Sequence, residues 1–163
     1  MSKEESHLPL FGPGPAYVMT IALLTVAGIA LSTLGFLPVA SAGAASVVLT
    51  VLGFAFMVGG VALWMTAVIG ARIDRGIKSN RLVTDGIYAF VRNPVYSAFM
   101  FLCTGIVFAF GNLWLLVLPF VFWAVLTIFM KATEEKWLSG LYGQDYADYC
   151  KRVNRCIPWF PGG

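Results

Sequence analysis

Two long stretches of the chain carry no charged side chain, and they constrain its fold more than any other feature. Residues 6–71 and 93–130 contain no Asp, Glu, Lys or Arg, so all 19 charged residues fall within the other 59 positions. A helix that crosses the hydrocarbon core of a bilayer needs about 20 apolar residues. The first stretch, of 66 residues, has room for two such helices, and the second, of 38, has room for two shorter ones.

The composition excludes a water-soluble fold. Only 12% of the 163 residues are charged and 59% are hydrophobic, with a mean hydropathy of +0.81, whereas soluble domains carry about 25% charged residues. Membrane β-strands would show alternating polarity over about ten residues, and the uncharged stretches have no such alternation. We therefore expect an all-α integral membrane protein that forms a single membrane domain over residues 1–163.

Four transmembrane helices are expected, at about 16–37, 45–71, 95–110 and 113–130. Asn93 and Pro94 are typical of a helix start, because asparagine accepts hydrogen bonds from free backbone N–H groups at the N-cap and proline fits the first helical position. Gly111 and Asn112 form a turn pair. The last two spans are therefore predicted to form an antiparallel hairpin.

The basic residues predict the orientation of these spans. With four crossings, every charged segment lies on one side of the membrane, and both connections on the other side are neutral. The positive-inside rule places the charged side in the cytoplasm. We expect a multi-pass protein with both termini cytoplasmic, in the cell membrane if the source is a prokaryote.

The tail, residues 131–160, is predicted to be a cytoplasmic helical segment at the membrane interface. Apolar and aromatic residues recur there at three- and four-residue steps with charges between them, which is the pattern of an amphipathic helix. Gly140 and Gly143 are expected to break it. Tyr142, Tyr146 and Tyr149 are interpreted as interfacial residues, where tyrosine is enriched.

No protein-bound metal is expected. The chain has one histidine, His7, and its three cysteines, Cys103, Cys150 and Cys156, lack the paired spacing of a zinc site or of a disulfide framework. The cysteines are interpreted as free thiols.

The predicted hairpin should bring two polar segments together. Residues 85–96 precede it and residues 133–136 follow it, and a chain that crosses and returns ends close to where it began. The combined site would hold the aromatic residues Tyr88 and Tyr96, the cation Arg92, and the carboxylates Glu134 and Glu135.

These residue types favour a ligand with several kinds of group. A helix N-terminus and an arginine favour a carboxylate or phosphate, whereas paired glutamates favour hydroxyls or a cation. S-adenosylmethionine fits, because it has a carboxylate, an ammonium, ribose hydroxyls, an adenine and a sulfonium that aromatic faces and carboxylates stabilise.

The same residues carry a resemblance to a known family. Gly86, Tyr88, Arg92, Pro94 and Tyr96, then Glu134-Glu135 and a tyrosine-rich tail ending in Ile157-Pro158, follow one another in the order found in the isoprenylcysteine carboxyl methyltransferase and phospholipid methyltransferase group. The resemblance covers residues 72–160. Where that family usually has histidine before the proline, this chain has Asn93, which retains hydrogen-bonding capacity but cannot titrate.

The resemblance implies transfer of a methyl group from S-adenosylmethionine to a lipophilic acceptor that enters from the bilayer at its cytosolic face. Isoprenylcysteine-like carboxylates, phospholipid amines and thiols are all compatible acceptors, and no nucleic acid partner is expected. Glu134 and Arg152 are the candidate catalytic residues, Arg152 by orienting an acidic acceptor. The candidate cofactor-binding residues are Tyr88, Arg92, Asn93, Pro94, Tyr96, Glu134 and Glu135.

Two other functions stay open from the sequence. Sterol reductases that use a nicotinamide cofactor (NADPH) have a related C-terminal hairpin and tail, although they are longer. A small four-span carrier is the third alternative, but such carriers normally place an ionisable residue inside a span, and the four expected spans contain no Asp, Glu, Lys, Arg or His.

Overall fold

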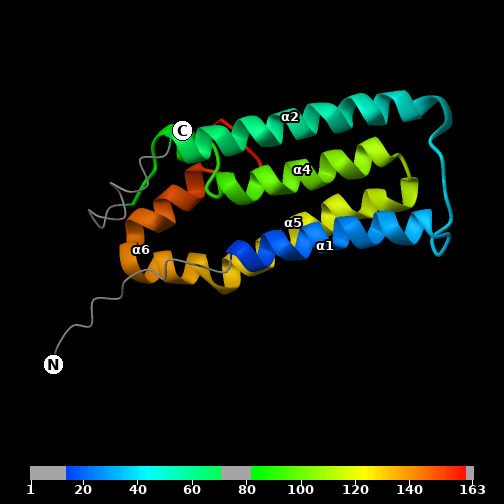
Figure 1. The fold of residues 1–163 in the computed structure, drawn as a ribbon. Helices are drawn as coiled ribbons and strands as arrows, with labels where there is room; N and C mark the ends of the chain where they lie inside the picture. The colour runs from blue at the N-terminus through cyan, green and yellow to red at the C-terminus, as the bar shows by residue number, and fades with distance from the viewer. Residues whose placement is uncertain (1–13, 71–81, 161–163) are drawn as a thin grey trace.

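The computed structural model describes residues 14–70 and 82–160, and within them the chain is helical (Figure 1). Four long helices lie side by side and alternate in direction, and the last helix, α6, closes one end of the bundle. The long helices are α1 (Gly14–Thr33), α2 (Ser46–Gly70), α4 (Pro94–Phe110) and α5 (Leu118–Ala132). Short 3₁₀ turns and the last helix are η1 (Gly43–Ala45), η2 (Gly86–Ala89), η3 (Leu113–Val117) and α6 (Glu134–Arg152).

Three helical stretches of the described chain are long and apolar enough to cross a membrane: Gly14–Thr33, Gly43–Ile69 and Leu113–Ala132. The helix Pro94–Phe110 is equally apolar in character but shorter, at 17 residues. Large apolar side chains cover the outside of the bundle, among them Val26, Phe54 and Phe120, which are 66%, 58% and 73% exposed. Such an apolar exterior is stable in lipid rather than water, so this is a membrane protein.

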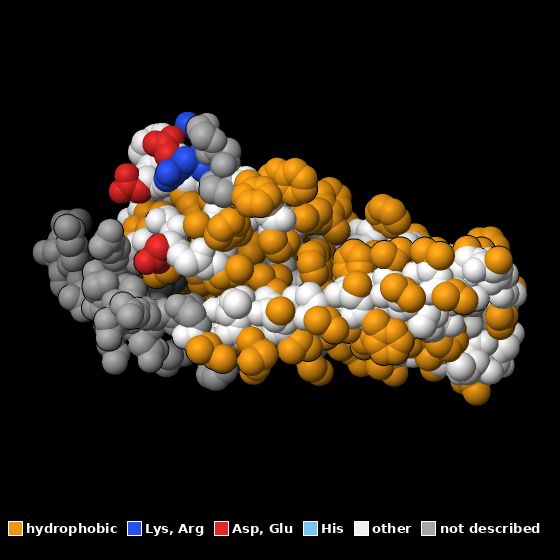
Figure 2. All heavy atoms as spheres, turned by 90° about the horizontal axis from the view of Figure 1, so that it is seen from above, with side chains coloured by type: hydrophobic (Ala, Val, Ile, Leu, Met, Phe, Trp, Pro, Cys, Tyr) orange, Lys and Arg blue, Asp and Glu red, His pale blue; other side chains and the backbone are white. Residues whose placement is uncertain are grey.

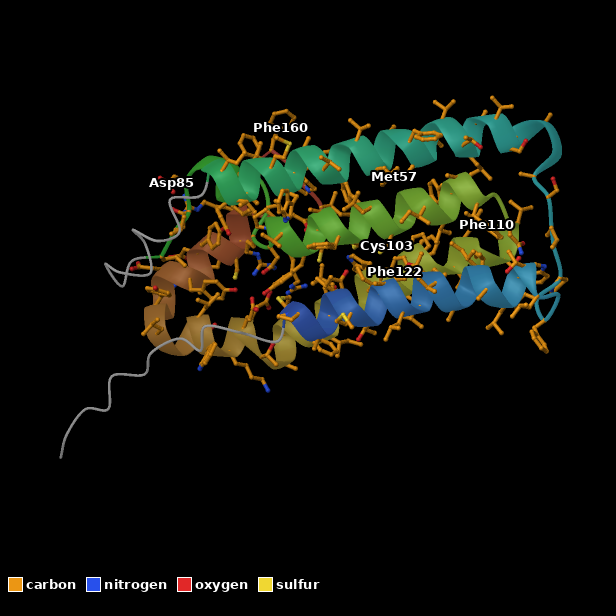
Figure 3. All side chains as sticks on the ribbon, in the orientation of Figure 1. Met57, Asp85, Cys103, Phe110, Phe122 and Phe160 are labelled. Atoms are coloured by element: carbon orange, nitrogen blue, oxygen red, sulfur yellow. The ribbon has the colours of Figure 1, made fainter. Side chains whose placement is uncertain are left out.

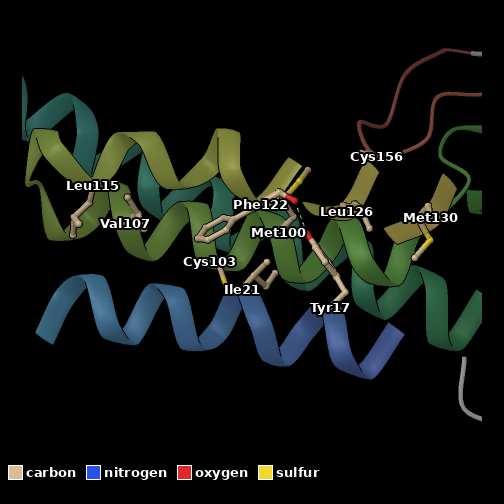
Figure 4. Packing of buried hydrophobic residues seen from close by; sticks show 10 residues of the cluster. All are labelled: Tyr17, Ile21, Met100, Cys103, Val107, Leu115, Phe122, Leu126, Met130 and Cys156. Atoms are coloured by element: carbon tan, nitrogen blue, oxygen red, sulfur yellow. Dashed lines mark hydrogen bonds between the residues drawn. The ribbon is translucent and has the colours of Figure 1, made fainter. Parts of the chain in front are cut away.

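Helix α4 is the interior helix of the bundle and contacts α1, α2 and α5. Its buried residues Met100, Cys103 and Val107 pack with Tyr17 and Ile21 of α1 and with residues of α5 in one cluster (Figure 4). The cluster also includes Phe122, Leu126 and Met130 of α5 and the tail residue Cys156. The helix Pro94–Phe110, which is shorter than the three stretches of membrane-spanning length, thus packs against all three of the other long helices.

Helix α2 packs on α4 through glycines. A Cβ atom added to Gly53 would lie 2.7 Å from the Gly105 carbonyl oxygen, and one added to Gly60 would lie 2.8 Å from the Ala98 oxygen. Small residues let two backbones approach closely, which is how helices associate in lipid. Met57 of α2 lies between these glycines, beside α4 (Figure 3).

At the bundle end away from α6, Asn112 ties the connection between α1 and α2 to the turn between α4 and α5. Its amide donates to the Ser32 hydroxyl (2.7 Å) and the Pro38 carbonyl (3.2 Å), and its oxygen accepts from the Ala40 and Trp114 amides (both 3.2 Å). Asn112 is 1% exposed, and its buried polar groups are therefore satisfied.

At two turns, the helix boundaries in the structure differ from the predicted ones. The first helix ends at Thr33 rather than near residue 37, because Gly35 adopts a left-handed conformation (φ 81°) and reverses the chain. The fourth apolar stretch begins with the 3₁₀ turn η3 before α5, and α5 continues to Ala132.

The structure of the tail differs more from the prediction. Its helix α6 kinks at Gly143 (φ 53°), as expected, but stays helical at Gly140. The interpretation of Tyr146 and Tyr149 as interfacial residues was wrong, since each is 4% exposed and they pack with Val153 in a small core. The tail folds back on the bundle and buries these rings against the segment before α4.

Charged side chains gather at the end of the molecule closed by α6. Figure 2 shows red and blue atoms at that end of the face in view, and orange and white along the rest of it. In Figure 3, Asp85 lies at this end and Phe110 at the opposite one. The charged side chains of the described residues are therefore confined to one end of the bundle.

Candidate active site

The first contact of the site joins the start of α4 to the start of α6. The Tyr96 hydroxyl donates to Glu134 Oε1 at 2.8 Å. Burial raises the pKa of Glu134, against the opposing effect of the Tyr96 hydrogen bond. Burial and the nearby Glu134 charge together raise the pKa of Tyr88. The expected contact between Tyr96 and Glu134 across the hairpin is present.

Glu135, the next residue, has different partners. Its Oε1 accepts from Arg92 Nη1 at 3.0 Å, and its two oxygens accept from Arg155 Nε at 2.5 Å and Nη2 at 3.0 Å. The side chains of Arg92, Glu135 and Arg155 are 9%, 17% and 19% exposed. One carboxylate thus holds two guanidinium groups in a largely buried ion-pair network.

Arg92 also holds the tail in place. Its Nε donates to the Val153 carbonyl at 3.0 Å, and its Nη1 donates to Cys150 Sγ at 2.7 Å. Its backbone N–H donates to the Asn154 carbonyl at 2.9 Å. The bonds of this side chain therefore run to Glu135 and to the tail.

Asn93 and Pro94 begin α4, but the expected capping bond is absent. Pro94 occupies the first turn, as predicted, and the Asn93 side chain accepts no hydrogen bond from the described helix. It donates instead to the Arg155 carbonyl at 3.2 Å. The tail lies so close to the helix start that its backbone offers Asn93 a partner across the site, which the sequence of α4 alone does not reveal.

Two residues that belong to this site escaped the sequence reasoning. Arg155 binds Glu135, and the Tyr149 hydroxyl donates to the Tyr88 carbonyl at 2.6 Å, fixing the segment that carries Tyr88. No local spacing links these residues to their partners, which lie 20 and 61 positions away in the chain. The available signal was a cation and a tyrosine on a tail that was predicted to lie at the cytoplasmic membrane interface, on the same side as the site.

The structure does not bring Arg152 to Tyr96 or Glu134 by any hydrogen bond or ion pair among the described residues. It is exposed at the end of α6 and makes no hydrogen bond or ion pair with a residue of the described ranges. It lines a separate cavity together with Arg92, Arg155 and the end of the tail.

Helix α1 covers the Tyr96 side of the site. The rings of Tyr17 and Tyr96 meet edge to face, with centroids 6.1 Å apart. Gly14 lies against the same ring so closely that a Cβ atom there would overlap the Tyr96 hydroxyl and ring. The Tyr17 hydroxyl donates to the Phe122 carbonyl at 3.4 Å (Figure 4), which fixes α1 to α5.

The model of one protein family, phospholipid methyltransferase, matches residues 48–145. The match covers more than half of the chain. The protein belongs to the phospholipid methyltransferase family. This confirms the resemblance noted from the sequence. The matched range contains α2, α4, α5 and both glutamates, whereas α1 and the tail residues Tyr149, Arg152 and Arg155 lie outside it.

Two curated relatives carry methyltransferase names. Protein-S-isoprenylcysteine O-methyltransferase of Schizosaccharomyces pombe is 39% identical over 87 residues, which make up 52% of this chain and 36% of the relative. Methanethiol S-methyltransferase 1 of Bradyrhizobium diazoefficiens is 37% identical over 84 residues, 48% of this chain and 27% of the relative. The chain therefore matches about a third of the length of these relatives. No solved structure matches it.

Proposed function

We propose that this protein transfers a methyl group from S-adenosylmethionine to a lipophilic acceptor at the cytosolic face of the membrane. The observation that carries the proposal is the pairing of Tyr96 with Glu134, at 2.8 Å, beside Tyr88. Family membership and the names of both relatives support the reaction class. The acceptor can be an isoprenylcysteine-like carboxylate, a phospholipid amine or a thiol.

The donor set fits a cationic ligand. Glu134 is a half-buried carboxylate whose hydrogen-bond partner in the described structure is a phenol, and burial raises its pKa. Such a carboxylate is stabilised by a nearby positive charge, and tyrosine faces also attract cations. S-adenosylmethionine supplies an electrophilic methyl group on a positive sulfur. Glu134, Tyr88 and Tyr96 would hold it.

The other polar residues act by positioning. Glu135 is bound to Arg92 and Arg155, so we propose that it and Arg92 organise the site rather than contact the cofactor. Asn93 and Pro94 set the start of α4 and hence the place of Tyr96. Because methyl transfer is a displacement on an already activated carbon, orientation and exclusion of water contribute most to its rate.

The proposal includes four membrane crossings with the site in the cytoplasm. Helix α4 is about 25 Å long at 1.5 Å per residue, somewhat short of a hydrocarbon core of about 30 Å. It packs against α1, α2 and α5, so much of its surface contacts protein rather than lipid. A start of α4 at the membrane surface would place Tyr96 where a bilayer-borne acceptor meets a soluble cofactor.

Calorimetric titration of the purified protein with S-adenosylmethionine tests the proposal. We expect binding to the wild type and at least a tenfold loss for Glu134→Gln, because a charged partner contributes about 1.5–3 kcal/mol. Asp148→Asn, a change of the same kind on the exposed part of α6, should bind normally. A folded wild type that binds neither S-adenosylmethionine nor S-adenosylhomocysteine would contradict the proposal.

A further inference from the structure

A cavity lies at the end of α6, and neither Tyr96 nor Glu134 lines it. Its volume is about 660 Å³. One wall carries the cations Arg92, Lys151, Arg152 and Arg155, and no carboxylate belongs to the described residues that line the cavity. The other wall is aromatic and apolar. Its members are Trp123 of α5 and the tail residues Ile157, Trp159 and Phe160.

The positive charge of this cavity is only partly neutralised. Glu135 supplies one negative charge to both Arg92 and Arg155, which leaves that group with an excess positive charge. Lys151 pairs with Asp148 at 2.8 Å, but the two side chains are 71% and 51% exposed, and exposed pairs of this kind interact weakly. Arg152 adds a further charge without a partner among the described residues.

The end of α6 does not remove this excess. The last turn of a helix carries about half a negative charge, and basic residues often lie there for that reason. Lys151 and Arg152 occupy that turn. Arg92, however, precedes another helix, and its Nε already donates to the Val153 carbonyl at 3.0 Å. A cavity that gathers cations from three segments therefore favours an anion.

The apolar wall is held at a defined position, and its large side chains are exposed. The backbone N–H of Trp159 donates to the Phe90 carbonyl at 3.1 Å. The rings of Phe90 and Phe160 meet edge to face, with centroids 6.3 Å apart. Trp123, Trp159 and Phe160 are 49%, 70% and 79% exposed. Exposed tryptophan is typical of the depth at which lipid headgroups meet acyl chains.

We propose that this cavity binds an acidic phospholipid, with its phosphate against Arg152 and Lys151 and its acyl chains beside Trp123 and Trp159. An anion alone would not use the apolar wall, and a zwitterionic lipid would not balance the excess charge. The lipid is a bound regulator or stabiliser of the tail rather than a methyl acceptor, so the proposal does not depend on methyl transfer. Because Arg92 and Arg155 face both the cavity and Glu135, its binding would reinforce the tail that completes the active site.

Native mass spectrometry of the full chain in detergent tests this proposal. The delipidated protein is titrated with phosphatidylglycerol and with phosphatidylcholine of identical acyl chains. We expect tighter binding of phosphatidylglycerol to the wild type and roughly a twentyfold loss in the double variant Lys151→Gln/Arg152→Gln, at about fivefold for each lost charge near the membrane surface. The double variant Lys131→Gln/Lys136→Gln, at two exposed positions, is the matched control and should bind as the wild type does.

Further measurements in the same experiment distinguish the possible outcomes. Inorganic phosphate that displaces the lipid at equal concentration would identify a soluble-anion site and overturn the assignment to a lipid. Equal binding of both lipids by the wild type, or unchanged binding of phosphatidylglycerol by Lys151→Gln/Arg152→Gln, would overturn it too. If that double variant fails to fold, Trp159→Ala, at a 70% exposed position, decides the matter, because the proposal requires it to weaken phosphatidylglycerol binding.

Discussion

Glu134 and Glu135 are adjacent in the chain but have different surroundings. Glu135 is held by two arginines in a largely buried network, whereas Glu134 accepts from the Tyr96 hydroxyl and lies near Tyr88. On successive positions of a helix the side chains point about 100° apart, which separates a residue facing the tail from one facing α4. The roles of the two carboxylates can therefore be tested separately, by substituting each one.

Replacing Glu135 should destabilise the protein. Glu135→Gln leaves Arg92 and Arg155 facing each other without the carboxylate that joins them. Breaking one partner of a buried ion pair costs about 3–5 kcal/mol, and we expect somewhat less here because the side chains are 9–19% exposed. Thermal unfolding in detergent measures the loss. A midpoint equal to that of the wild type would mean that the network does not hold the tail.

The raised pKa of Glu134 should make the proposed binding of S-adenosylmethionine depend on pH. The carboxyl group loses its proton only above its ordinary pKa of 4.5, and its protonated form offers no charge to a cation. The affinity for S-adenosylmethionine should therefore rise as the pH increases through the pKa of Glu134 and then level off. Without ligand the sign is opposite, since the folded state binds this proton more tightly and gains stability as the pH falls through the same window.

Calorimetric titration across pH checks this dependence. In Glu134→Gln the rise in affinity should be absent. S-adenosylhomocysteine, which lacks the sulfonium charge, should show a weaker rise in the wild type. A profile that is the same in the wild type and in Glu134→Gln would assign the titration to another group.

At the scale of helices, the site depends on an element outside the matched family range. Helix α1 presents Gly14 and Tyr17 to the Tyr96 ring, although the family match begins only at residue 48. An aromatic pair of this geometry contributes about 0.5–1.5 kcal/mol beyond its buried area. The position of α1 thus restricts where the Tyr96 hydroxyl can lie.

Gly14→Ala tests this restriction. The added methyl group would overlap Tyr96, displacing the hydroxyl from Glu134 and lowering the affinity for S-adenosylmethionine by about tenfold, the value of a hydrogen bond of roughly 1.4 kcal/mol to a charged group. Gly140→Ala is the control, because a Cβ atom there has open space and alanine favours a helix by about 1 kcal/mol. It should bind normally and unfold at the same or a higher temperature. Full affinity in Gly14→Ala would show that α1 does not constrain Tyr96.

For the whole molecule, the alternating directions of α1, α2, α4 and α5 bring α6 to the end of the bundle where α1 begins (Figure 1). Charged side chains gather at the same end (Figure 2). If all four helices cross the membrane, both chain ends lie on one side, and the basic residues there favour the cytoplasm.

Reporter fusions test this topology. A fluorescent protein that matures only in the cytoplasm should be active at either terminus, and a periplasmic phosphatase inserted in the neutral segment 40–44 should be active when the protein is expressed in a bacterium. Termini on opposite sides would mean that α4 and α5 do not both cross. The proposed site would then not lie at the membrane surface.

The sequence by itself determined the helical membrane fold, because two uncharged stretches of 66 and 38 residues lack the alternating polarity of barrel strands, and lipid otherwise admits only helices. It also predicted that the hairpin of α4 and α5 brings Tyr96 near Glu134, since a turn at Gly111 and Asn112 leaves the chain no other return. These features depend on local hydrophobicity and on turns, which neighbouring residues specify.

Only the tertiary structure decided how the tail completes the site. The bonds from Arg155 to Glu135, from Asn93 to the Arg155 carbonyl and from Tyr149 to the Tyr88 carbonyl join residues 20 to 62 positions apart. The kink at Gly143 and the pairing of residues 90–93 with the end of the chain turn the tail back. Burial of Tyr146 and Tyr149 stabilises that return. Such contacts depend on packing between distant segments, which no local pattern of the sequence encodes.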